Sequence, residues 1–234
     1  MYVPNTNLTV PDMHSPELEI LIREYALINE FPANYIFSSP GETIDGIYYI
    51  KEGRTKHYML SSDGIEKVLY VLSSGWLFGE TPYILQTRTG LYSQTETKSI
   101  LYQISRNNVN TLMEKSNLFR NALMQCYANK LLILRCEIEN LSFNSCKNRI
   151  KRLFCASVDT KNVPDPEWYD LKIKYTHYQL GVIVGAARVT ISKLIQELCV
   201  EKFIRVLNRQ IQINRRLYDE YISTINQDWY KKDG

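Results

Sequence analysis

The sequence predicts an α+β protein in which a β-roll is followed by a long helix and then by a winged helix-turn-helix unit. Three observations predict this order. Short alternating segments separated by turn residues fill most of the first hundred positions, an unbroken helical pattern covers residues 117–141, and two short helices around Gly185 precede two alternating strands. We therefore expect an arm and roll over residues 1–105, a linker and pairing helix over 106–141, and the winged unit over 142–234.

The predicted roll begins after a Pro-punctuated arm and one helix, for which the pattern covers "SPELEILIREYALINEF". The strand segments that follow are "YIFSSPGE", "DGIYYIKEG", "RTKHYMLSSDG", "IEKVLYVLSSG", "WLFGE" and "SILYQIS". They are rich in Tyr, Ile and Val, and turn residues such as Pro-Gly or Asp-Gly close them about every ten residues, which is typical of a compact antiparallel roll. His57 falls in one of these strands, and we expect it at the surface.

The long helical segment contains neither Pro nor Gly between Asn117 and Leu141. Its apolar residues recur at steps of three and four, close to the repeat of about 3.5 residues by which helices pair along a seam. The predicted seam residues are Leu123, Tyr127, Leu131, Leu134, Ile138 and Leu141. A homodimer contact is the favoured interpretation. Packing of the helix on its own roll is the alternative, and one helix can do both on different faces.

Two short helices around Gly185 form the next unit. Thr176 is suited to cap the first helix, Gly185 can adopt the positive φ that ends it, and the second helix starts at Arg188 and runs to about Lys202. The following "FIRVLNRQIQIN" predicts a hairpin wing around "NRQ". In such a unit the start of the second helix reaches the base edges of double-stranded DNA.

Charge supports a nucleic-acid partner for this unit. Residues 142–234 carry 16 Lys and Arg against 10 Asp and Glu, a net charge of +6, whereas residues 1–141 carry 12 against 15, a net charge of −3. A basic segment is expected of a module that neutralises phosphates, and Arg205 and Arg209 of the wing are candidates for that role. The residues expected to contact DNA are Thr176, His177, Arg188, Val189, Thr190, Ser192, Lys193 and Arg209.

Other functional classes are disfavoured. The five cysteines (Cys126, Cys136, Cys146, Cys155 and Cys199) form no C-x-x-C pair, and the three histidines are not at metal-ligand spacing, so we expect no metal and no other cofactor. A redox-sensing thiol remains an alternative. The chain has no nucleophile elbow and no phosphate-cradling Gly-rich loop, so we do not expect an enzyme. Without a long apolar run or a signal sequence, we expect a cytoplasmic protein with no membrane contact.

Several segments resemble the Crp/Fnr family of bacterial transcription regulators. They are "THYQLGVIVGAARVTISKLIQEL", the preceding "NRIKRLF", the roll segments "GETIDGIYYIKEG" and "GWLFGE", and the long helix between them. The resemblance covers nearly the whole chain. It implies a cyclic-nucleotide-binding-like roll that binds a small effector, a dimerisation helix, and a winged helix-turn-helix that reads a palindromic promoter site. It also implies RNA polymerase as a partner, with activation and repression both open.

The sequence departs from the family pattern at the residues that bind the cyclic phosphate. Cyclic-AMP-binding members carry an Arg-Ser pair after the roll's F-G-E, whereas Thr89 and Gly90 stand at those positions here. Arg88 is one residue away, and adjacent strand positions face opposite sides of a sheet. A cyclic-nucleotide effector is therefore disfavoured, although it remains an alternative. Members with an iron-sulfur cluster carry N-terminal cysteines, and this chain has none before Cys126.

A closer similarity is to the CprK type regulators of organohalide respiration, which sense chlorinated phenolic acids. They place a Tyr and a Lys toward the effector, at positions that match Tyr127 and Lys130 here, and a Lys ammonium near a phenol favours the phenolate. The expected effector-binding residues are Gly79, Glu80, Tyr83, Tyr92, Tyr127, Lys130, Leu131 and Leu134. The alternative for Tyr127 is a place in the dimer seam, and for Lys130 a solvated face. A constitutive or redox-sensing regulator without an effector also remains open.

The start of the second helix, "RVTISK", resembles the H-V-T-V-S-R of the CprK type. Many relatives carry Glu after the leading Arg, and Glu can accept a hydrogen bond from cytosine and so fix a G·C pair. Val189 has no acceptor, but its methyl groups can pack on a thymine methyl. We therefore expect an A·T-rich half-site of the TTAA kind.

Overall fold

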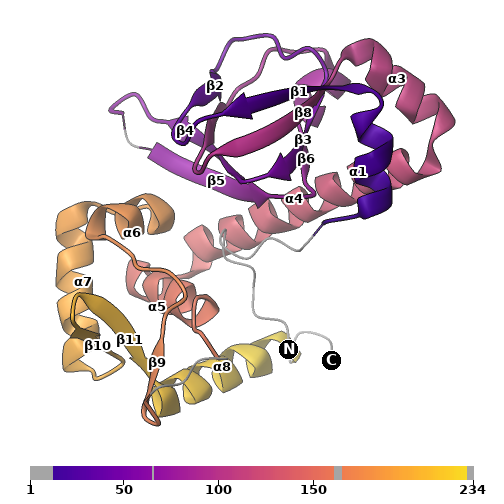
Figure 1. Ribbon diagram of the computed structural model, residues 1–234. Coiled ribbons are helices and arrows are strands. Elements are labelled where there is room, and N and C mark those ends of the chain that lie inside the picture. Colours follow the sequence, from indigo (N-terminus) through magenta and orange to yellow (C-terminus); the bar gives the residue numbers. More distant parts are fainter. Residues whose placement is uncertain (1–12, 65, 161–164, 231–234) are drawn as a thin grey trace. The chain divides into compact units, whose positions relative to one another are not determined.

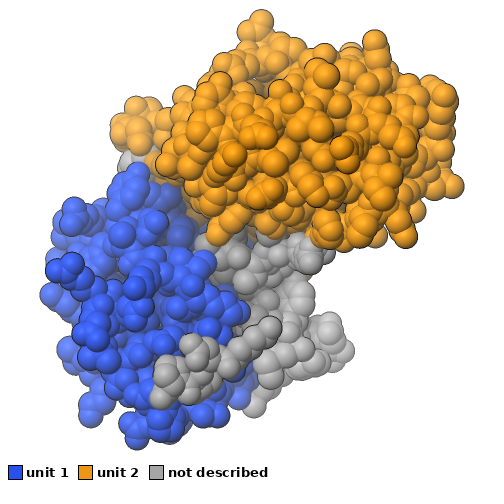
Figure 2. Space-filling model, viewed as in Figure 1, with its two compact units in different colours: residues 1–9, 136–234 blue, residues 10–135 orange. Residues whose placement is uncertain are grey.

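The computed structural model describes residues 13–64, 66–160 and 165–230 (Figure 1). The chain forms two compact units that divide inside one long helix, between Arg135 and Cys136 (Figure 2). We call residues 13–135 the N-terminal unit and residues 136–230 the C-terminal unit. Residues 1–12, most of the predicted arm, lie outside the described residues. The functional boundaries expected after residues 105 and 141 stay predictions.

The N-terminal unit is built on two four-stranded antiparallel sheets, so the α+β fold and the roll predicted from turn spacing are confirmed. One sheet has the order β1-β8-β3-β6, formed by Ala26–Phe31, Ser99–Ile104, Ile47–Glu52 and Leu77–Phe78. The other has the order β2-β7-β4-β5, formed by Ile36–Ser38, Tyr92–Thr95, Arg54–Leu60 and Glu66–Ser73. Trp76, Tyr49 and Phe119 are the largest side chains that are fully buried in its core.

The first helix is shorter than the sequence pattern predicts. Helix α1 covers only Pro16–Arg23, where Ser15 caps it and the apolar face buries Leu18 and Ile22. The prediction that the helix continues through "ALINEF" is wrong, because these residues form β1 and pair with β8 along its whole length. Pairing with a distant strand overrides the local helical pattern here, as tertiary context often does.

Three helices follow or interrupt the strands of this unit: α2 (Glu80–Leu85), α3 (Arg106–Lys115) and α4 (Asn117–Phe143). Helix α4 matches the long helix predicted from residues 117–141. One face of it, including Leu123, Cys126 and Ile133, is buried in the core of the N-terminal unit. Another face leaves a row of apolar side chains exposed, and this row is Met124, Tyr127, Leu131, Ile138 and Leu141.

One residue of the predicted seam is therefore misplaced. Leu123 is only 5% exposed and belongs to the core, whereas its neighbour Met124 is 71% exposed. With Met124 in place of Leu123, and with the half-buried Leu134 included, the row has alternating steps of three and four residues. Such spacing keeps all members on one face of a helix. We call Met124, Tyr127, Leu131, Leu134, Ile138 and Leu141 the exposed α4 row.

The C-terminal unit combines helices with a small antiparallel sheet. Its helices are α5 (Cys146–Ala156), α6 (His177–Val184), α7 (Arg188–Val200) and α8 (Arg215–Tyr230), and its strands are β9 (Trp168–Asp170), β10 (Ile204–Leu207) and β11 (Gln210–Asn214), in the order β10-β11-β9. The strand predicted over "YDLKIKY" ends early, at Asp170. A core that includes Phe154, Leu180, Ile191 and Ile213 joins these elements.

Candidate functional site: the reading helix and the roll cavity

The turn between α6 and α7 has the geometry that the sequence predicts. Thr176 caps α6 in a capping box with Gln179, which satisfies amide groups at both residues. Gly185 ends the helix with φ of 68°. A Cβ atom on Gly181 would lie 2.6 Å from the carbonyl oxygen of Ala186, so only glycine lets the turn fold back this closely. These contacts fix the entry of α7.

Helix α7 buries one side and exposes its N-terminal end. Ile191, Ile195 and Leu198 lie in the core of the C-terminal unit. Four of the predicted contact residues are exposed at the start of this helix, and they are Arg188, Val189, Thr190 and Lys193. The cap position is Ala187, which offers no side-chain hydrogen bond to the first amide groups. These amides therefore remain able to donate to an anion such as a phosphate.

The structure joins two of the other predicted contact residues to each other. His177 Nδ1 and Ser192 Oγ lie 3.0 Å apart, and the Ser192 hydroxyl also lies 3.1 Å from the carbonyl oxygen of Arg188. Because His177 begins α6 and Ser192 lies on α7, this contact ties the two helices together. Thr176 caps α6 and remains exposed.

The wing is a tight hairpin in which the two arginines differ. Asn208 and Arg209 both adopt positive φ, of 50° and 60°, which closes a turn between β10 and β11. Arg209 is exposed, as predicted. The expectation that Arg205 is also available to phosphates is wrong. Its guanidinium donates to Asp165 Oδ2 and to Gln212 Oε1, both at 2.6 Å, and lies over the ring of Trp168.

A buried ion pair is the main polar feature of the N-terminal unit. Lys130 Nζ of α4 donates to Glu80 Oε1 and to the carbonyl oxygen of Leu77, both at 2.8 Å. The two side chains are only 5% and 4% exposed, and the ammonium lies 5.6 Å from the centre of the Tyr70 ring. Gly79, whose φ is 91°, makes a sharp turn immediately before Glu80, the first residue of α2. The alternative of a solvated face for Lys130 is therefore wrong.

His57 is fully buried beside this pair, contrary to the predicted surface position. Its two ring nitrogens lie 3.0 Å from Thr55 Oγ1 and 3.1 Å from Ser93 Oγ. Burial, and then the charge of Lys130, hold the pKa of His57 well below its usual range. Burial in β4 alternates regularly up to His57, with Thr55 and His57 buried and Lys56 half-buried, and the register shift opposite His57 and Tyr58 leaves Leu69 of β5 as the extra residue.

A small cavity of about 110 Å³ opens next to Glu80 and His57. Its lining residues are Ile44, His57, Tyr70, Phe78, Gly79, Glu80, Thr81, Pro82, Arg88, Thr89, Gly90, Leu91 and Ser93. Arg88 is exposed and donates to the carbonyl oxygen of Gly41, whereas Thr89 is buried and bonds through its backbone to Glu42. Neither residue therefore offers a buried positive charge that could bind a phosphate.

Only part of the predicted effector set surrounds this cavity. Gly79 and Glu80 line it, and Lys130 contacts Glu80. Tyr83 instead donates to Asn110 under the guanidinium of Arg106, and Tyr92 stacks on Tyr58 at 5.1 Å. The predicted Tyr127, Leu131 and Leu134 belong to the exposed α4 row and do not line the cavity. The sequence analysis did not predict four other lining residues, because strand alternation alone does not show which side chains from different strands meet at one cavity. These residues are His57, Tyr70, Phe78 and Ser93.

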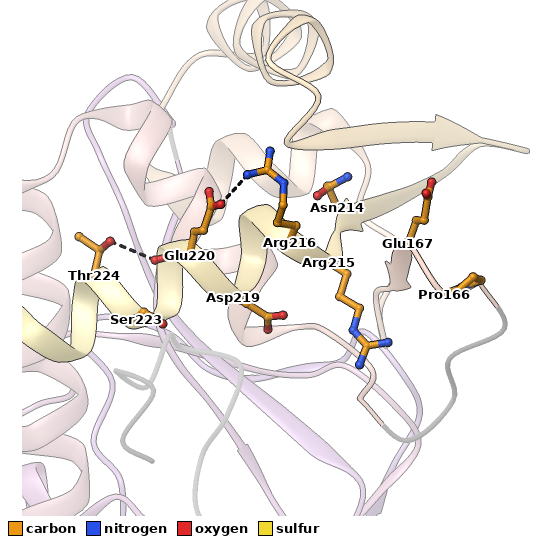
Figure 3. A pocket seen from close by; sticks show the side chains of 9 residues that line it. All are labelled: Pro166, Glu167, Asn214, Arg215, Arg216, Asp219, Glu220, Ser223 and Thr224. Atoms are coloured by element: carbon orange, nitrogen blue, oxygen red, sulfur yellow. Dashed lines mark hydrogen bonds and ion pairs between the residues drawn. The ribbon is translucent and has the colours of Figure 1, made fainter.

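A larger hollow, of about 820 Å³, lies at the start of α8 (Figure 3). Acidic and basic side chains share its wall, and Arg216 is paired with Glu220. None of the residues predicted to contact DNA lines it. We assign no role to this hollow.

Known proteins match both units. Residues 28–116 match the cyclic nucleotide-binding domain. The cAMP-activated global transcriptional regulator CRP of Haemophilus influenzae is 22% identical over 188 residues, which are 80% of this chain and 83% of that protein. A solved transcriptional regulator of the CRP/FNR family from Thermus thermophilus has a TM-score of 0.64 at 22% identity and covers 83% of this chain and 97% of its own. Residues 28–116 therefore belong to the cyclic nucleotide-binding domain family, and most of the chain is similar to Crp/Fnr transcription regulators.

A CprK structure in complex with OCPA is also similar to this chain. The TM-score is 0.68 at 20% identity, over 84% of this chain and 89% of that one. In the part of the chain that the structure describes, no helix is long and apolar enough to cross a membrane. The same residues contain no group of three or more His, Cys, Asp or Glu placed to hold a metal ion.

Proposed function

We propose that the protein is an effector-responsive transcription regulator that binds an A·T-rich palindrome as a homodimer. The observation that carries this proposal is the exposed start of α7. Arg188, Val189, Thr190 and Lys193 lie there together, and among the described residues none of these side chains has a hydrogen-bond or ion-pair partner. They are free to meet base edges and phosphates, with Arg209 of the wing beside a further phosphate.

The exposed α4 row supports dimerisation. Met124, Leu131 and Ile138 are each more than half exposed, and they repeat at the spacing of helices that pair. Large apolar side chains in a continuous row are expected to be covered by a partner. A second copy of the same helix offers a matching row, and the resulting twofold symmetry suits a palindrome whose half-sites are about 34 Å apart.

We assign the effector site to the roll cavity beside Glu80. Tyr70, Phe78 and Ile44 give it apolar walls, and Glu80 and Ser93 offer polar contacts, a combination that suits a small aromatic molecule. The similarity to CprK complexed with OCPA supports a phenolic or aromatic acid. Binding would shift a pre-existing equilibrium between two arrangements of the dimer, provided that the effector prefers one of them. Contact with RNA polymerase completes the proposed regulation.

One observation favours an alternative regulator without an effector. The cavity is small, and Lys130 already has the carboxylate of Glu80 as its partner. A redox-sensing role receives less support, because burial raises the pKa of Cys126, and that of Cys155 to about 12, which leaves little reactive thiolate. A cyclic nucleotide is a weaker candidate for the effector, because Thr89 and Gly90 stand where relatives carry the Arg-Ser pair that binds the cyclic phosphate.

A gel-shift titration with the upstream DNA of the protein's own gene tests the proposal. We expect a dimer to bind a palindrome there, with a strength that an effector changes. Binding to no palindrome with any ligand, or a purely monomeric protein, contradicts it. A thermal-shift screen separates the effector-free alternative, because a ligand at 100 times its dissociation constant adds about 2.7 kcal/mol of stability.

A further inference from the structure

The roll cavity presents a carboxylate, and not an ammonium, to any ligand. Glu80 lines the cavity, whereas Lys130 does not. Two donor positions of the Lys130 ammonium are engaged by Glu80 Oε1 and the carbonyl oxygen of Leu77, and the ring of Tyr70 covers another side. Among the described residues, Glu80 has no hydrogen-bond partner other than Lys130, so the carboxylate keeps capacity to accept from a ligand.

The buried groups around the cavity carry no net charge. Lys130 and Glu80 compensate each other within the N-terminal unit. Burial and Lys130 keep His57 neutral by lowering its pKa, and burial keeps Tyr70 and the Cys126 thiol neutral by raising theirs. Among the described residues that line the cavity, the remaining cation is Arg88, which is exposed at the rim and is screened by solvent. An anion placed beside Glu80 would therefore bring an uncompensated charge into a buried site.

We propose that the roll cavity binds its ligand only in a net-neutral, hydrogen-bond-donating form, as a weak acid that keeps its proton. A phenol fits this class, with its hydroxyl donating to Glu80 and its ring against Tyr70 and Phe78. Each ligand then enters with one proton, which stays on the phenol oxygen and is donated to the Glu80 carboxylate. The inference rests on the proposed effector site, and it reverses the expectation that Lys130 receives a phenolate.

The test compares three probes on the full-length protein by calorimetric titration. Phenol stays neutral until about pH 10, pentafluorophenol ionises below neutral pH, and benzenesulfonate is a permanent anion of similar shape. We expect phenol to bind independently of pH between about 6 and 8, and the affinity for pentafluorophenol to fall about tenfold per pH unit over that range, because the bound form carries one more proton. Benzenesulfonate should not bind.

Glu80→Gln provides the reverse experiment. It leaves the Lys130 ammonium uncompensated, so benzenesulfonate and pentafluorophenolate should now bind, without the pH dependence. A double variant, Glu80→Gln with Lys130→Met, is neutral again; it should bind phenol and reject both anions, and it remains a test if the single variant does not fold. Arg88→Gln is the control for the exposed rim and should leave the order of affinities unchanged.

The proposal is overturned if wild-type protein binds benzenesulfonate as tightly as phenol, if pentafluorophenol affinity is constant with pH, or if no probe binds. The outcome is separable from that of the proposed function. Failure to bind any palindrome, together with the predicted pH dependence, rejects the regulator and keeps the cavity chemistry. Normal DNA binding with pH-independent uptake of anions rejects only the cavity chemistry.

Discussion

Arg205 and Asp165 form an ion pair of 2.6 Å at the base of the wing, and the same guanidinium covers the ring of Trp168. The arginine side chain is 35% exposed. This contact holds the β10-β11 hairpin to the segment that leads into β9. It separates the two wing arginines by role, because Arg205 supports the sheet while Arg209 at the tip remains exposed.

Substitution of the two wing arginines should therefore have different effects. Arg209→Ala removes one phosphate contact, so the slope of log affinity against log salt should decrease by about 1 in magnitude, with unchanged thermal stability. Arg205→Ala should instead lower the melting temperature. Salt titrations of DNA binding and melting curves measure both. An unchanged salt slope for Arg209→Ala means that the wing does not touch the backbone.

Val189→Glu tests base reading by α7. The new carboxylate can accept from a cytosine amino group, so preference should shift toward G·C at one position of each half-site by roughly 1 to 3 kcal/mol. Competition binding with paired A·T and G·C sites measures this shift. If wild-type and variant proteins bind both sites equally, Val189 contacts no base.

Leu131→Asp tests the exposed α4 row. Leu131 is 56% exposed, so the variant monomer should fold, while the charge would be buried in a paired helix and should dissociate the dimer. Ile84→Asp, at a similarly exposed residue of α2, is the matched control and should leave the dimer intact. Sedimentation equilibrium distinguishes the two. A dimeric Leu131→Asp protein places the interface elsewhere.

Lys130→Met should be strongly destabilising because it leaves the buried Glu80 carboxylate without its partner. A loss of about 3 to 5 kcal/mol is expected for breaking a buried pair in this way. Addition of Glu80→Gln should restore most of the stability, since the neutral pair no longer contains a buried charge. Urea unfolding of the wild-type protein, both single variants and the double variant gives the four free energies of unfolding that a double-mutant cycle needs. Additive losses would show that the two side chains are not coupled.

His57 predicts a fall of stability in mild acid. The folded pKa is lowered, so the unfolded chain, with His near 6.5, binds more protons once the pH drops below about 6.5. Between that value and the folded pKa, stability should fall by up to about 1.4 kcal/mol per pH unit. His57→Gln should flatten this dependence. Equal slopes for wild-type and variant proteins in urea unfolding contradict a neutral buried histidine.

The sequence was sufficient for the order of elements where local signals are strong. The absence of Pro and Gly along α4, the Thr176 cap and the flexible Gly185 are local features, and each element lies where they predict it. The start of β1 was not predictable in this way. Its residues become a strand only because β8 lies beside them, and the paired residues, from Phe31 with Ser99 to Ala26 with Ile104, are far apart in the sequence.

The roll cavity was harder to predict because it depends on register. A register shift between β4 and β5 beside His57 leaves Leu69 of β5 as an extra residue, and no local residue pattern predicts it. The choice between Leu123 and Met124 similarly required the position of the roll against α4. Family resemblance placed Lys130 in the interior, but only the structure assigned Glu80 as its partner.

The central claim is that two copies of the α7 surface read an A·T-rich palindrome. The most direct measurement is fluorescence anisotropy with a TTAA-type palindrome, the same DNA with one half-site scrambled, and an Arg188→Ala variant as control. We predict that scrambling one half-site weakens binding of wild-type protein by at least tenfold, a loss of about 1.4 kcal/mol or more, and that Arg188→Ala weakens binding to the intact palindrome. Equal affinity of wild-type protein for the intact and scrambled DNA would contradict the account.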